Sequence, residues 1–443
     1  MICSYKNGRR IALLAATLGL GCNLGSTTTG TGTLTVVVQQ STGLYSPSGV
    51  YLPNAIQGNV ALAGPSGYTT TMSVTTTLIS LASGSYAITA APVLVPNAIV
   101  SVVDTAVASP NPVTVGDGGN DSATVTYGVR PGTGGLWVAN GGSTSPGTVT
   151  EFGNAKLSAS GSPTPTARLT NAALTGAAGV AVDLTGGLWI ATSANAIVEY
   201  PSALLVGSTA SPANTLTVAS APVAIAFDPA GDLWVCLASA GEVVEYSASQ
   251  LAALSGSGTP SPVLTLQLSA LTAGPGGLAF DSYGNLWIAS SGSGSLIELS
   301  SSTLAGPGGA VVPALLIQSA QTVDAIAPVF DAQGNLWVVT SLNMLAEFSI
   351  AQLPSLTPTT TPALTLTVNS AGAAAGAAFD NSGSLWLPMG VGQNVIALTA
   401  TQLAAGGTQS PTVAIGGVTD PSALAFNAHA TYVPVAGSKR PRR

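Results

Sequence analysis

The chain has 443 residues, of which 46% are hydrophobic and only 6% are charged, whereas about a quarter of the residues are charged in ordinary globular proteins. So few charges exclude a coiled coil, a solvated helical bundle and a disordered acidic tail, all of which depend on charged side chains. Residues 11–438 hold three of the ten basic residues against all 17 acidic ones, so a nucleic-acid interface, which needs a basic surface, is excluded there.

Residues 1–22 have the pattern of an export signal. A basic segment, residues 6–10, precedes an apolar run at residues 11–21 that is too short to span a bilayer. The run ends Gly-Leu-Gly-Cys22, which resembles the lipobox of bacterial lipoproteins, and that resemblance implies that Cys22 is lipidated. Cleavage without lipidation, which gives a soluble exported protein, is the alternative. We therefore expect an exported protein anchored in the cell envelope, either periplasmic or at the cell surface.

The segment after the signal divides into a tether and a small domain. Residues 23–33 are rich in Gly and Thr, and we expect a flexible tether there. Residues 34–127 contain short runs that alternate apolar and polar residues, separated by Gly, Pro and Asn. This pattern, which has no helical period, predicts a β-sandwich. Residues 60–92 resemble the immunoglobulin-like or carboxypeptidase-regulatory-like sandwiches of bacterial surface proteins, which implies a spacer or adhesion module.

Residues 128–437 repeat one unit. Each tryptophan follows a leucine, and successive tryptophans are 52, 45, 53, 50 and 49 residues apart: Trp137, Trp189, Trp234, Trp287, Trp337 and Trp386. An Asp and a turn precede most of them, an apolar run that ends in Glu follows each of the first five, and a fourth run comes after that. Four strands per unit of about 50 residues indicate a β-propeller blade. Because one blade cannot bury both faces of its sheet, the blades must stack and the ring must close.

The number of blades follows from counting strands. Five units are complete; a set of second, third and fourth strands precedes them at residues 136–170, and a lone first strand follows at residues 423–427. The lone strand can complete the first set, which predicts an all-β fold with a six-bladed propeller behind the small β-sandwich. Residues 431–434 look like a decayed second strand and leave a seventh blade open. The last six residues, 438–443, form a basic tail.

The recurring Asp-x-x-Gly-Asn-Leu-Trp hairpin resembles that of NHL-repeat propellers and of the wider group that contains gluconolactonases and streptogramin lyases. The resemblance covers about 300 residues and implies the propeller fold. Gluconolactonase-like enzymes gather a Glu, an Asn and an Asp around a divalent cation at the tunnel mouth, and streptogramin-lyase chemistry resembles a His-assisted elimination. The only histidine, His429, falls in the decayed final hairpin, where we interpret it as a solvated turn residue rather than a general base.

The repeated carboxylates have a structural interpretation. An Asp that opens a four-residue turn accepts hydrogen bonds from the backbone two residues on, and the Gly takes the left-handed conformation. The glutamates occupy equivalent positions in the repeat and so share one environment. A catalytic acid and base need two different environments, so that their pKa values differ. We expect them to be exposed or to accept hydrogen bonds from hydroxyl, amide or indole groups. We interpret Cys236, alone in an apolar run, as a small buried hydrophobe.

The segments that approach the first strands offer few metal ligands. Only Asp324 and Asp420 are acidic there, and these two are weak candidates for holding a hydrated Ca²⁺. We therefore predict no catalytic residue, no cofactor and no firm metal site. The loops that join second to third strands contain small polar residues, which suit hydrogen bonding to a glycan or a protein surface.

The expectation is a non-enzymatic cell-envelope protein, monomeric and held to the membrane by a lipid, whose propeller acts as a binding scaffold for a protein or glycan. The alternative is a metal-dependent, lactonase- or lyase-like enzyme that uses the tunnel mouth.

Overall fold

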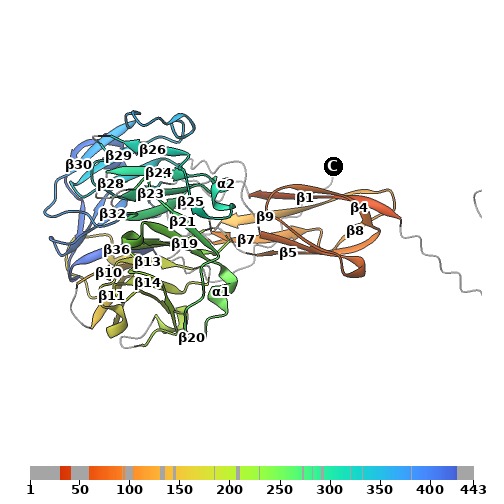
Figure 1. Cartoon of the computed structure of the whole chain (residues 1–443), viewed down its shortest axis with the longest axis horizontal. Coiled ribbons are helices and arrows are strands. Elements are labelled where there is room, and N and C mark those ends of the chain that lie inside the picture. The colour runs from red at the N-terminus through yellow and green to blue at the C-terminus, as the bar shows by residue number, and fades with distance from the viewer. Residues whose placement is uncertain are drawn as a thin grey trace, which may run out of the picture.

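The computed structural model describes residues 30–40, 59–91, 93–94, 103–129, 135–142, 146–183, 185–205, 210–228, 230–271, 274–281, 283–290, 294–319, 321–331, 333–380 and 382–426. These residues form eight sheets of four or five strands, divided between two bodies (Figure 1). Five predictions lie wholly or mostly outside them: the signal with Cys22, the tether 23–33, the segment 431–434, His429 and the basic tail. No helix in the described ranges has the length and apolar character to span a membrane.

The N-terminal body is a β-sandwich, as the alternating runs predict. One sheet has the order β4-β1-β9-β7-β6 and the other β3-β2-β5-β8. The strands are β1 (Thr31–Gln40), β2 (Asn59–Ala63), β3 (Thr69–Met72), β4 (Thr76–Ala82), β5 (Gly84–Ala91), β6 (Val93–Leu94), β7 (Val103–Ser109), β8 (Val113–Val115) and β9 (Asn120–Val129), with a 3-10 turn η1 (Pro65–Gly67) after β2. Alternate residues of the two sheets, such as Leu34, Val60 and Tyr86, share one buried core.

The first strand begins earlier than the sequence suggests. β1 starts at Thr31, inside the segment 23–33 that was expected to be a tether. Thr31 and Gly32 pair with β4, and Thr33 pairs with β9. Thr favours strands but Gly disfavours them, so the pairing with neighbouring strands on both sides determines this conformation.

The second body contains six sheets, numbered here as blades. Blade 1 is β36 (Pro421–Phe426), β10 (Leu136–Asn140), β11 (Gly147–Phe152) and β12 (Ala167–Asn171); blade 2 is β13 (Gly179–Val182), β14 (Leu188–Thr192), β15 (Ala196–Tyr200), β16 (Asn214–Thr217) and β20 (Gly256–Gly258). Blade 3 is β17 (Ala224–Phe227), β18 (Leu233–Leu237), β19 (Glu242–Tyr246), β21 (Leu264–Gln267) and β25 (Gly309–Ala310); blade 4 is β22 (Gly277–Phe280), β23 (Leu286–Ser290), β24 (Ser295–Leu299) and β26 (Leu315–Gln318). Blade 5 is β27 (Ala325–Phe330), β28 (Leu336–Thr340), β29 (Met344–Phe348), β30 (Leu364–Val368) and β34 (Gly407–Gln409); blade 6 is β31 (Ala378–Phe379), β32 (Leu385–Met389), β33 (Asn394–Leu398) and β35 (Val413–Ile415).

Within the part of the chain that the structure describes, short helices occur only between strands. Three are α-helical: α1 (Ala248–Ala252), α2 (Ser301–Leu304) and α3 (Ala400–Ala405). Each follows the third strand of its blade, and a Ser or Thr side chain caps it by accepting the backbone N–H three residues on. The other 3-10 turns are η2 (Asn154–Lys156), η3 (Ala172–Leu174), η4 (Ser202–Leu204), η5 (Ala238–Ala240) and η6 (Leu353–Ser355).

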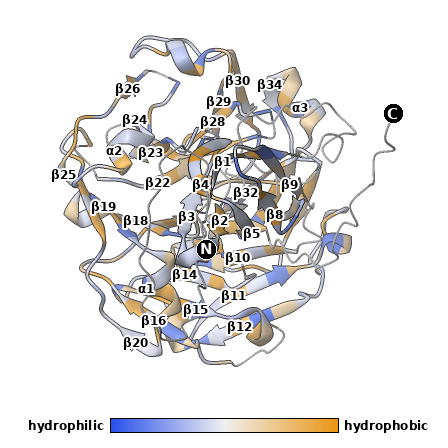
Figure 2. Cartoon of the chain, turned by 90° about the vertical axis from the view of Figure 1, so that its right-hand side faces the viewer, coloured by the Kyte–Doolittle hydropathy of each residue, from blue (hydrophilic) through white to orange (hydrophobic). Residues whose placement is uncertain are grey.

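The last described strand closes the ring. β36 pairs antiparallel with β10, so that Leu136 lies opposite Phe426 and Val138 opposite Leu424. The first strands lie beside one another in the order β36, β13, β17, β22, β27, β31 and back to β36. Viewed from the sandwich side, the sheets surround a common centre (Figure 2). The described residues therefore make a closed ring in which the last described strand, β36, completes the blade that β10 begins.

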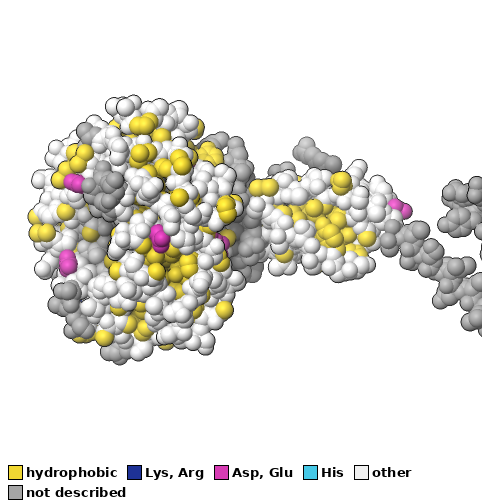
Figure 3. Space-filling view, viewed as in Figure 1, with side chains coloured by type: hydrophobic (Ala, Val, Ile, Leu, Met, Phe, Trp, Pro, Cys, Tyr) yellow, Lys and Arg dark blue, Asp and Glu magenta, His cyan; other side chains and the backbone are white. Residues whose placement is uncertain are grey.

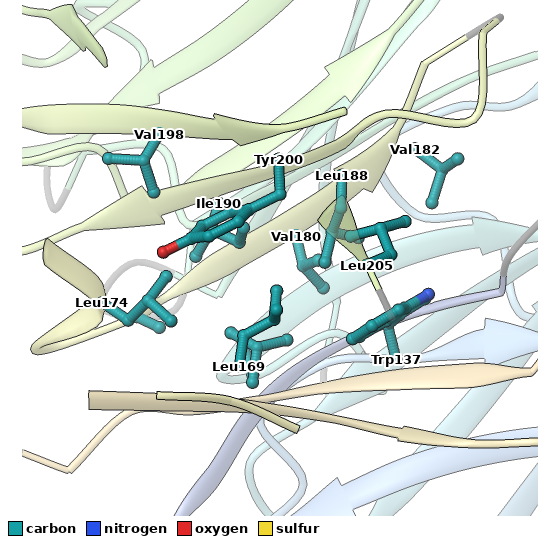
Figure 4. Close-up of a cluster of buried hydrophobic side chains, with 13 residues drawn as sticks. Trp137, Leu169, Leu174, Val180, Val182, Leu188, Ile190, Val198, Tyr200 and Leu205 are labelled. Carbon is teal, nitrogen blue, oxygen red and sulfur yellow. The ribbon is translucent and has the colours of Figure 1, made fainter. Parts of the chain in front are cut away.

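The tryptophans lie between neighbouring blades, and all six are buried. Five of them meet a first-strand phenylalanine of the next blade edge-on, with ring centroids 5.7–6.4 Å apart: Trp189–Phe227, Trp234–Phe280, Trp287–Phe330, Trp337–Phe379 and Trp386–Phe426. The last pair joins blade 6 to blade 1, so the closing contact repeats the contact between consecutive blades. Trp137 packs instead with Val180, Val182 and Leu188 of blade 2 (Figure 4).

Candidate functional site

The recurring aspartate organises the hairpin between the first and second strands. Oδ1 of Asp281 accepts the N–H groups of Tyr283 at 2.8 Å and Asn285 at 2.9 Å. Oδ2 of Asp281 accepts the indole N–H of Trp287 at 3.0 Å, and Gly284 has a φ of 77°. The same bonds are made by Asp183, Asp228, Asp331 and Asp380. These bonds confirm the turn interpretation, because both carboxylate oxygens already have partners within the hairpin.

Blade 1 departs from this pattern. Its tryptophan, Trp137, has a buried indole nitrogen with no acceptor among the described residues. The position that corresponds to the aspartate is residue 427, which directly follows β36 and lies outside the described ranges.

Each blade glutamate lies directly opposite the tryptophan of its own sheet: Glu151, Glu199, Glu245, Glu298 and Glu347. All five are partly exposed, and burial is the main cause that raises the pKa of each carboxyl. Of the partners expected from the sequence, an amide is found at Glu199, which accepts the Nδ2–H of Asn214 at 2.6 Å. In blades 2 to 5 the indole N–H groups donate to the hairpin aspartates instead.

Blade 3 differs from blades 4 and 5 at one position of the hairpin. In blades 4 and 5, Asn285 and Asn335 each donate Nδ2–H to Oδ2 of the hairpin aspartate at 2.9 Å. Their Oδ1 atoms accept the backbone N–H that follows the third strand, at 3.0 Å and 2.9 Å. Blade 3 has Asp232 instead, whose Oδ1 accepts the N–H of Ala248 at 2.7 Å. A carboxylate keeps the acceptor role of the amide but has no proton to donate to Asp228.

Three carboxyl groups therefore meet in blade 3, namely Asp228, Asp232 and Glu245. Burial, and next the charge of Asp232, raises the pKa of Asp228 to about 6. Burial, the charges of Asp232 and Asp228, and a hydrogen bond with Asp232 raise the pKa of Glu245 to about 7. The basic side chains of the described propeller, Lys156 and Arg168, lie in blade 1. The expectation of one environment for all five glutamates is wrong at Glu245, because its hairpin neighbour is an acid rather than an amide.

The other end of the propeller is formed by the loops between second and third strands and by the segments that enter the first strands. We call this end the loop face. Asp324 and Asp420 lie here, each six residues before the end of a first strand, with φ of 56° and 52°. Gly176 and Gly274 take the same position in blades 2 and 4, with φ of 66° and 74°. Two aspartates thus adopt a conformation that glycine adopts with less strain.

The two aspartates support the backbone of the loop face. The carbonyl oxygen of Asp324 accepts the N–H of Ser341 at 3.0 Å, and that of Asp420 accepts the N–H of Gly141 at 2.8 Å. They belong to blades 5 and 1, so blade 6 lies between them. Within the described ranges, no three His, Cys, Asp or Glu side chains form a group able to hold a metal ion. Asp324 and Asp420 are therefore not members of such a group.

Some polar side chains of the loop face are used internally. Asn140 is buried; its Nδ2 donates to Oγ1 of Thr148 at 2.8 Å, and its Oδ1 accepts the N–H of Thr419. Asn343, with φ of 60°, donates Nδ2–H to the carbonyl oxygen of Gly372 at 2.5 Å. Both amides hold the loops in place, and Asn140 belongs to the small polar loop residues that the sequence suggested as ligand contacts.

Three exposed apolar side chains lie on the loop face, and no pattern in the sequence indicated them. Val323 is 43% exposed, Leu342 58% and Val391 81%. We call these three side chains the loop-face patch. Val323 and Leu342 lie side by side, because the residues next to them, Asp324 and Ser341, share a backbone hydrogen bond.

The patch continues from blade 5 to blade 6. Asn343, next to Leu342, binds the carbonyl oxygen of Gly372 and the N–H of Ala374. Val391 in turn lies against Gly372, since a Cβ built on that glycine would lie 2.9 Å from Cβ of Val391. The three side chains of the patch therefore lie on adjoining segments of blades 5 and 6.

Cys236 is buried in β18 and forms no disulfide. Burial raises the pKa of its thiol far above the usual value. A thiol in this state is not nucleophilic, in keeping with the interpretation as a small buried hydrophobe.

No family model matches the chain, and no curated protein matches it. Among solved structures it is similar to a streptogramin B lyase, with 14% identity over 51% of this chain, 66% of that chain and a TM-score of 0.38. It is also similar to a protein of unknown function from Bacteroides caccae, with 9% identity, 67% and 99% coverage and a TM-score of 0.47. A chain of a nidogen/laminin complex gives 13% identity, 66% and 98% coverage and a TM-score of 0.49. The chain thus spans just under two thirds of the streptogramin B lyase, and these likenesses concern the β-propeller fold.

Proposed function

We propose that the protein is a non-enzymatic binding scaffold of the cell envelope, which recognises a partner protein through the loop face of its propeller. The observation that carries this proposal is the loop-face patch. Contiguous exposed apolar surface costs free energy in water unless a partner covers it, and on soluble proteins it marks interaction sites. The sequence left a protein and a glycan open as ligands, and the aliphatic character of the three side chains favours a protein.

The support beneath the patch is preorganised. Asn343 holds its loop against the segment that enters blade 6 through hydrogen bonds to Gly372 and Ala374. The backbone bond from Ser341 to Asp324 holds it against the segment that enters its own blade. A surface that is already ordered loses little conformational entropy on binding, which favours affinity.

The charges on the loop face restrict the kind of partner. Asp324, Asp420 and Glu242 lie on loop-face segments, and neither Lys156 nor Arg168 does. Opposite charges around an apolar centre favour association and orient the partner. We therefore expect a partner surface with aliphatic or aromatic side chains bordered by Lys or Arg.

The envelope location rests on the export signal and on Cys22. A lipid at Cys22 would tie the chain to a membrane, and the immunoglobulin-like sandwich would then act as the spacer between the membrane and the propeller.

Site-specific photo-crosslinking on intact cells tests the proposal. A photoreactive amino acid at position 342 should trap one discrete protein. The same photoreactive amino acid at position 323 should trap that protein too, and the double substitution Leu342→Ser and Val391→Ser should abolish this second trapping. The matched control is position 283, because Tyr283 is an exposed aromatic residue at the opposite, hairpin end. The absence of an adduct at position 342, or the same adduct at position 283, would contradict the proposal.

One observation favours the alternative of a metal-dependent, lactonase- or lyase-like enzyme. Asp324 and Asp420 adopt strained left-handed conformations, and such strain is found more often at functional sites. Calorimetric titration with Ca²⁺ separates the two functions. Tight binding that Asp324→Ala or Asp420→Ala abolishes would support the enzyme and oppose the scaffold.

A further inference from the structure

A hollow lies at one edge of the sandwich, between its two sheets. Its volume is about 620 Å³, and its walls include Pro65, Tyr68, Leu78, Ile79 and Tyr86. The rings of Tyr68 and Tyr86 meet edge-on with centroids 5.9 Å apart. Apolar side chains gather on the sandwich between its two sheets in the space-filling view (Figure 3). Part of the sandwich core is therefore open to solvent at this edge.

The strand that borders the hollow has a free edge and a protruding side chain. β4 pairs with β1 and with no other strand of the described ranges. Its register with β1 shifts between Leu78 and Leu81, and Ser80 within this bulge has φ of 57°. Bulges re-aim side chains on edge strands, and here Ile79 is 74% exposed. An exposed aliphatic side chain thus lies at the rim of an apolar hollow.

This edge carries no charge. Residues 59–91, which include every residue of the hollow, contain no Asp, Glu, Lys, Arg or His. Edge strands are commonly protected from pairing by charged side chains, and β4 has none. Because the chain as a whole is acidic, two copies repel one another across most surfaces, and this uncharged edge avoids that repulsion.

We propose that two copies of this chain associate through the β4 edge, with Ile79 of each copy seated in the hollow of the other. A protruding side chain and a hollow on the same patch make that patch self-complementary, and a two-fold symmetric contact requires such a patch. The bulge interrupts β4, so side-chain packing rather than a long backbone ladder holds the contact. The patch is small against the surface that a permanent dimer buries, so the association is reversible. This proposal is independent of the loop face, and it replaces the monomer expected from the sequence.

Sedimentation equilibrium of the full chain tests the proposal, with Cys22→Ser to remove the predicted lipid site. The mean mass should rise with concentration from one copy toward two. Ile79→Lys should hold the chain at the mass of one copy without changing its thermal unfolding, because the substituted side chain is already exposed. The matched control is Val74→Lys, since Val74 is also exposed on the sandwich but does not line the hollow. This control should leave the association intact.

Two outcomes would overturn the proposal. One is a chain that keeps the mass of one copy at every concentration, and the other is an association that Ile79→Lys does not weaken. A photoreactive amino acid at position 79 provides a second measurement. A cross-linked band of two copies supports the proposal, whereas an adduct with a different protein or a glycan assigns the hollow to another occupant and overturns it.

Discussion

The indole nitrogen of Trp287 donates its proton to Oδ2 of Asp281 at 3.0 Å. Through this bond, the residue that closes the hairpin also orients the ring that fills the space between blades. The ring then meets Phe330 of the next blade edge-on, with centroids 6.3 Å apart. The same Asp and Trp bond recurs in the five blades whose hairpins are described. The fixed spacing of six residues between Asp and Trp is therefore a structural requirement of the ring.

Removing the acceptor tests this coupling. Asp281→Ala deletes four hydrogen bonds and leaves a buried indole N–H without its partner, which should cost about 1–3 kcal/mol of unfolding free energy. Urea denaturation followed by tryptophan fluorescence measures the change. Asp117→Ala, at an exposed position of the sandwich, should change stability by less than about 0.5 kcal/mol. Equal effects of the two substitutions would contradict the role of Asp281.

Truncating the ring tests the packing between blades. Trp287→Ala removes a buried aromatic side chain and should cost about 3–5 kcal/mol. Tyr283 lies four residues away in the same blade, but its side chain is exposed. Tyr283→Ala should therefore leave the urea midpoint almost unchanged. A near-zero effect of Trp287→Ala would mean that the ring does not support the contact with blade 5.

The acidic cluster of blade 3 predicts a pH dependence. The folded-state pKa values of Asp228 and Glu245, about 6 and about 7, exceed the unfolded values of 3.8 and 4.5. The folded state therefore binds protons more tightly, and stability from this cluster is present at low pH and is lost as the pH rises from about 4 to about 7. Asp232→Asn supplies the missing Nδ2–H and removes one charge. It should raise stability near pH 8 by about 1 kcal/mol, the usual size of one hydrogen bond, and have little effect at pH 4.

The reverse substitution provides the control. Asn285→Asp should create the same cluster in blade 4 beside Asp281 and Glu298, and so make the chain less stable at pH 8 but not at pH 4. Both variants are compared with the parent chain at each pH, because the other blade glutamates also titrate. If the difference between Asp232→Asn and the parent chain does not change with pH, the three carboxyls are not coupled.

The anchor is tested by fractionation. Cys22→Ser should move the protein from the membrane fraction to the soluble fraction of the envelope, because the thiol that would carry the lipid is gone. Loss of radiolabelled palmitate incorporation should accompany the move. Unchanged partitioning would refute lipidation at Cys22.

The sequence was sufficient for the framework of the fold. Alternating runs predicted the sandwich, and the Leu-Trp repeat predicted the propeller strands, including the pairing of β36 with β10. It did not predict β20, β25 and β34. Each of these strands lies in the chain between the third and fourth strands of one blade, and it pairs in parallel with the outer strand of the preceding blade. Their segments are short and rich in Gly, so they carry no strand signal, and only the exposed edge of the neighbouring sheet makes them extended.

The candidate sites were less predictable. The role of the hairpin aspartates followed from the Asp and Gly spacing alone. The Asp232 cluster had a visible signal, since Gly-Asp-Leu-Trp replaces the Gly-Asn-Leu-Trp of blades 4 and 5. Its meaning required knowing that the amide of that Asn donates to the hairpin aspartate, Asp281 in blade 4 and Asp331 in blade 5. Val323, Leu342 and Val391 lie far apart in the sequence, so only the folded ring brings them together.

Ring closure through β36 is the claim on which the propeller depends, and hydrogen–deuterium exchange of the full chain tests it most directly. In a closed ring, the paired amides of residues 421–426 should exchange as slowly as those of β13 and β17. Phe426→Ala, which removes the contact with Trp386, should speed exchange in β36 and β10 together. Rapid exchange of residues 421–426 beside protected first strands in the other blades would show that the ring is open.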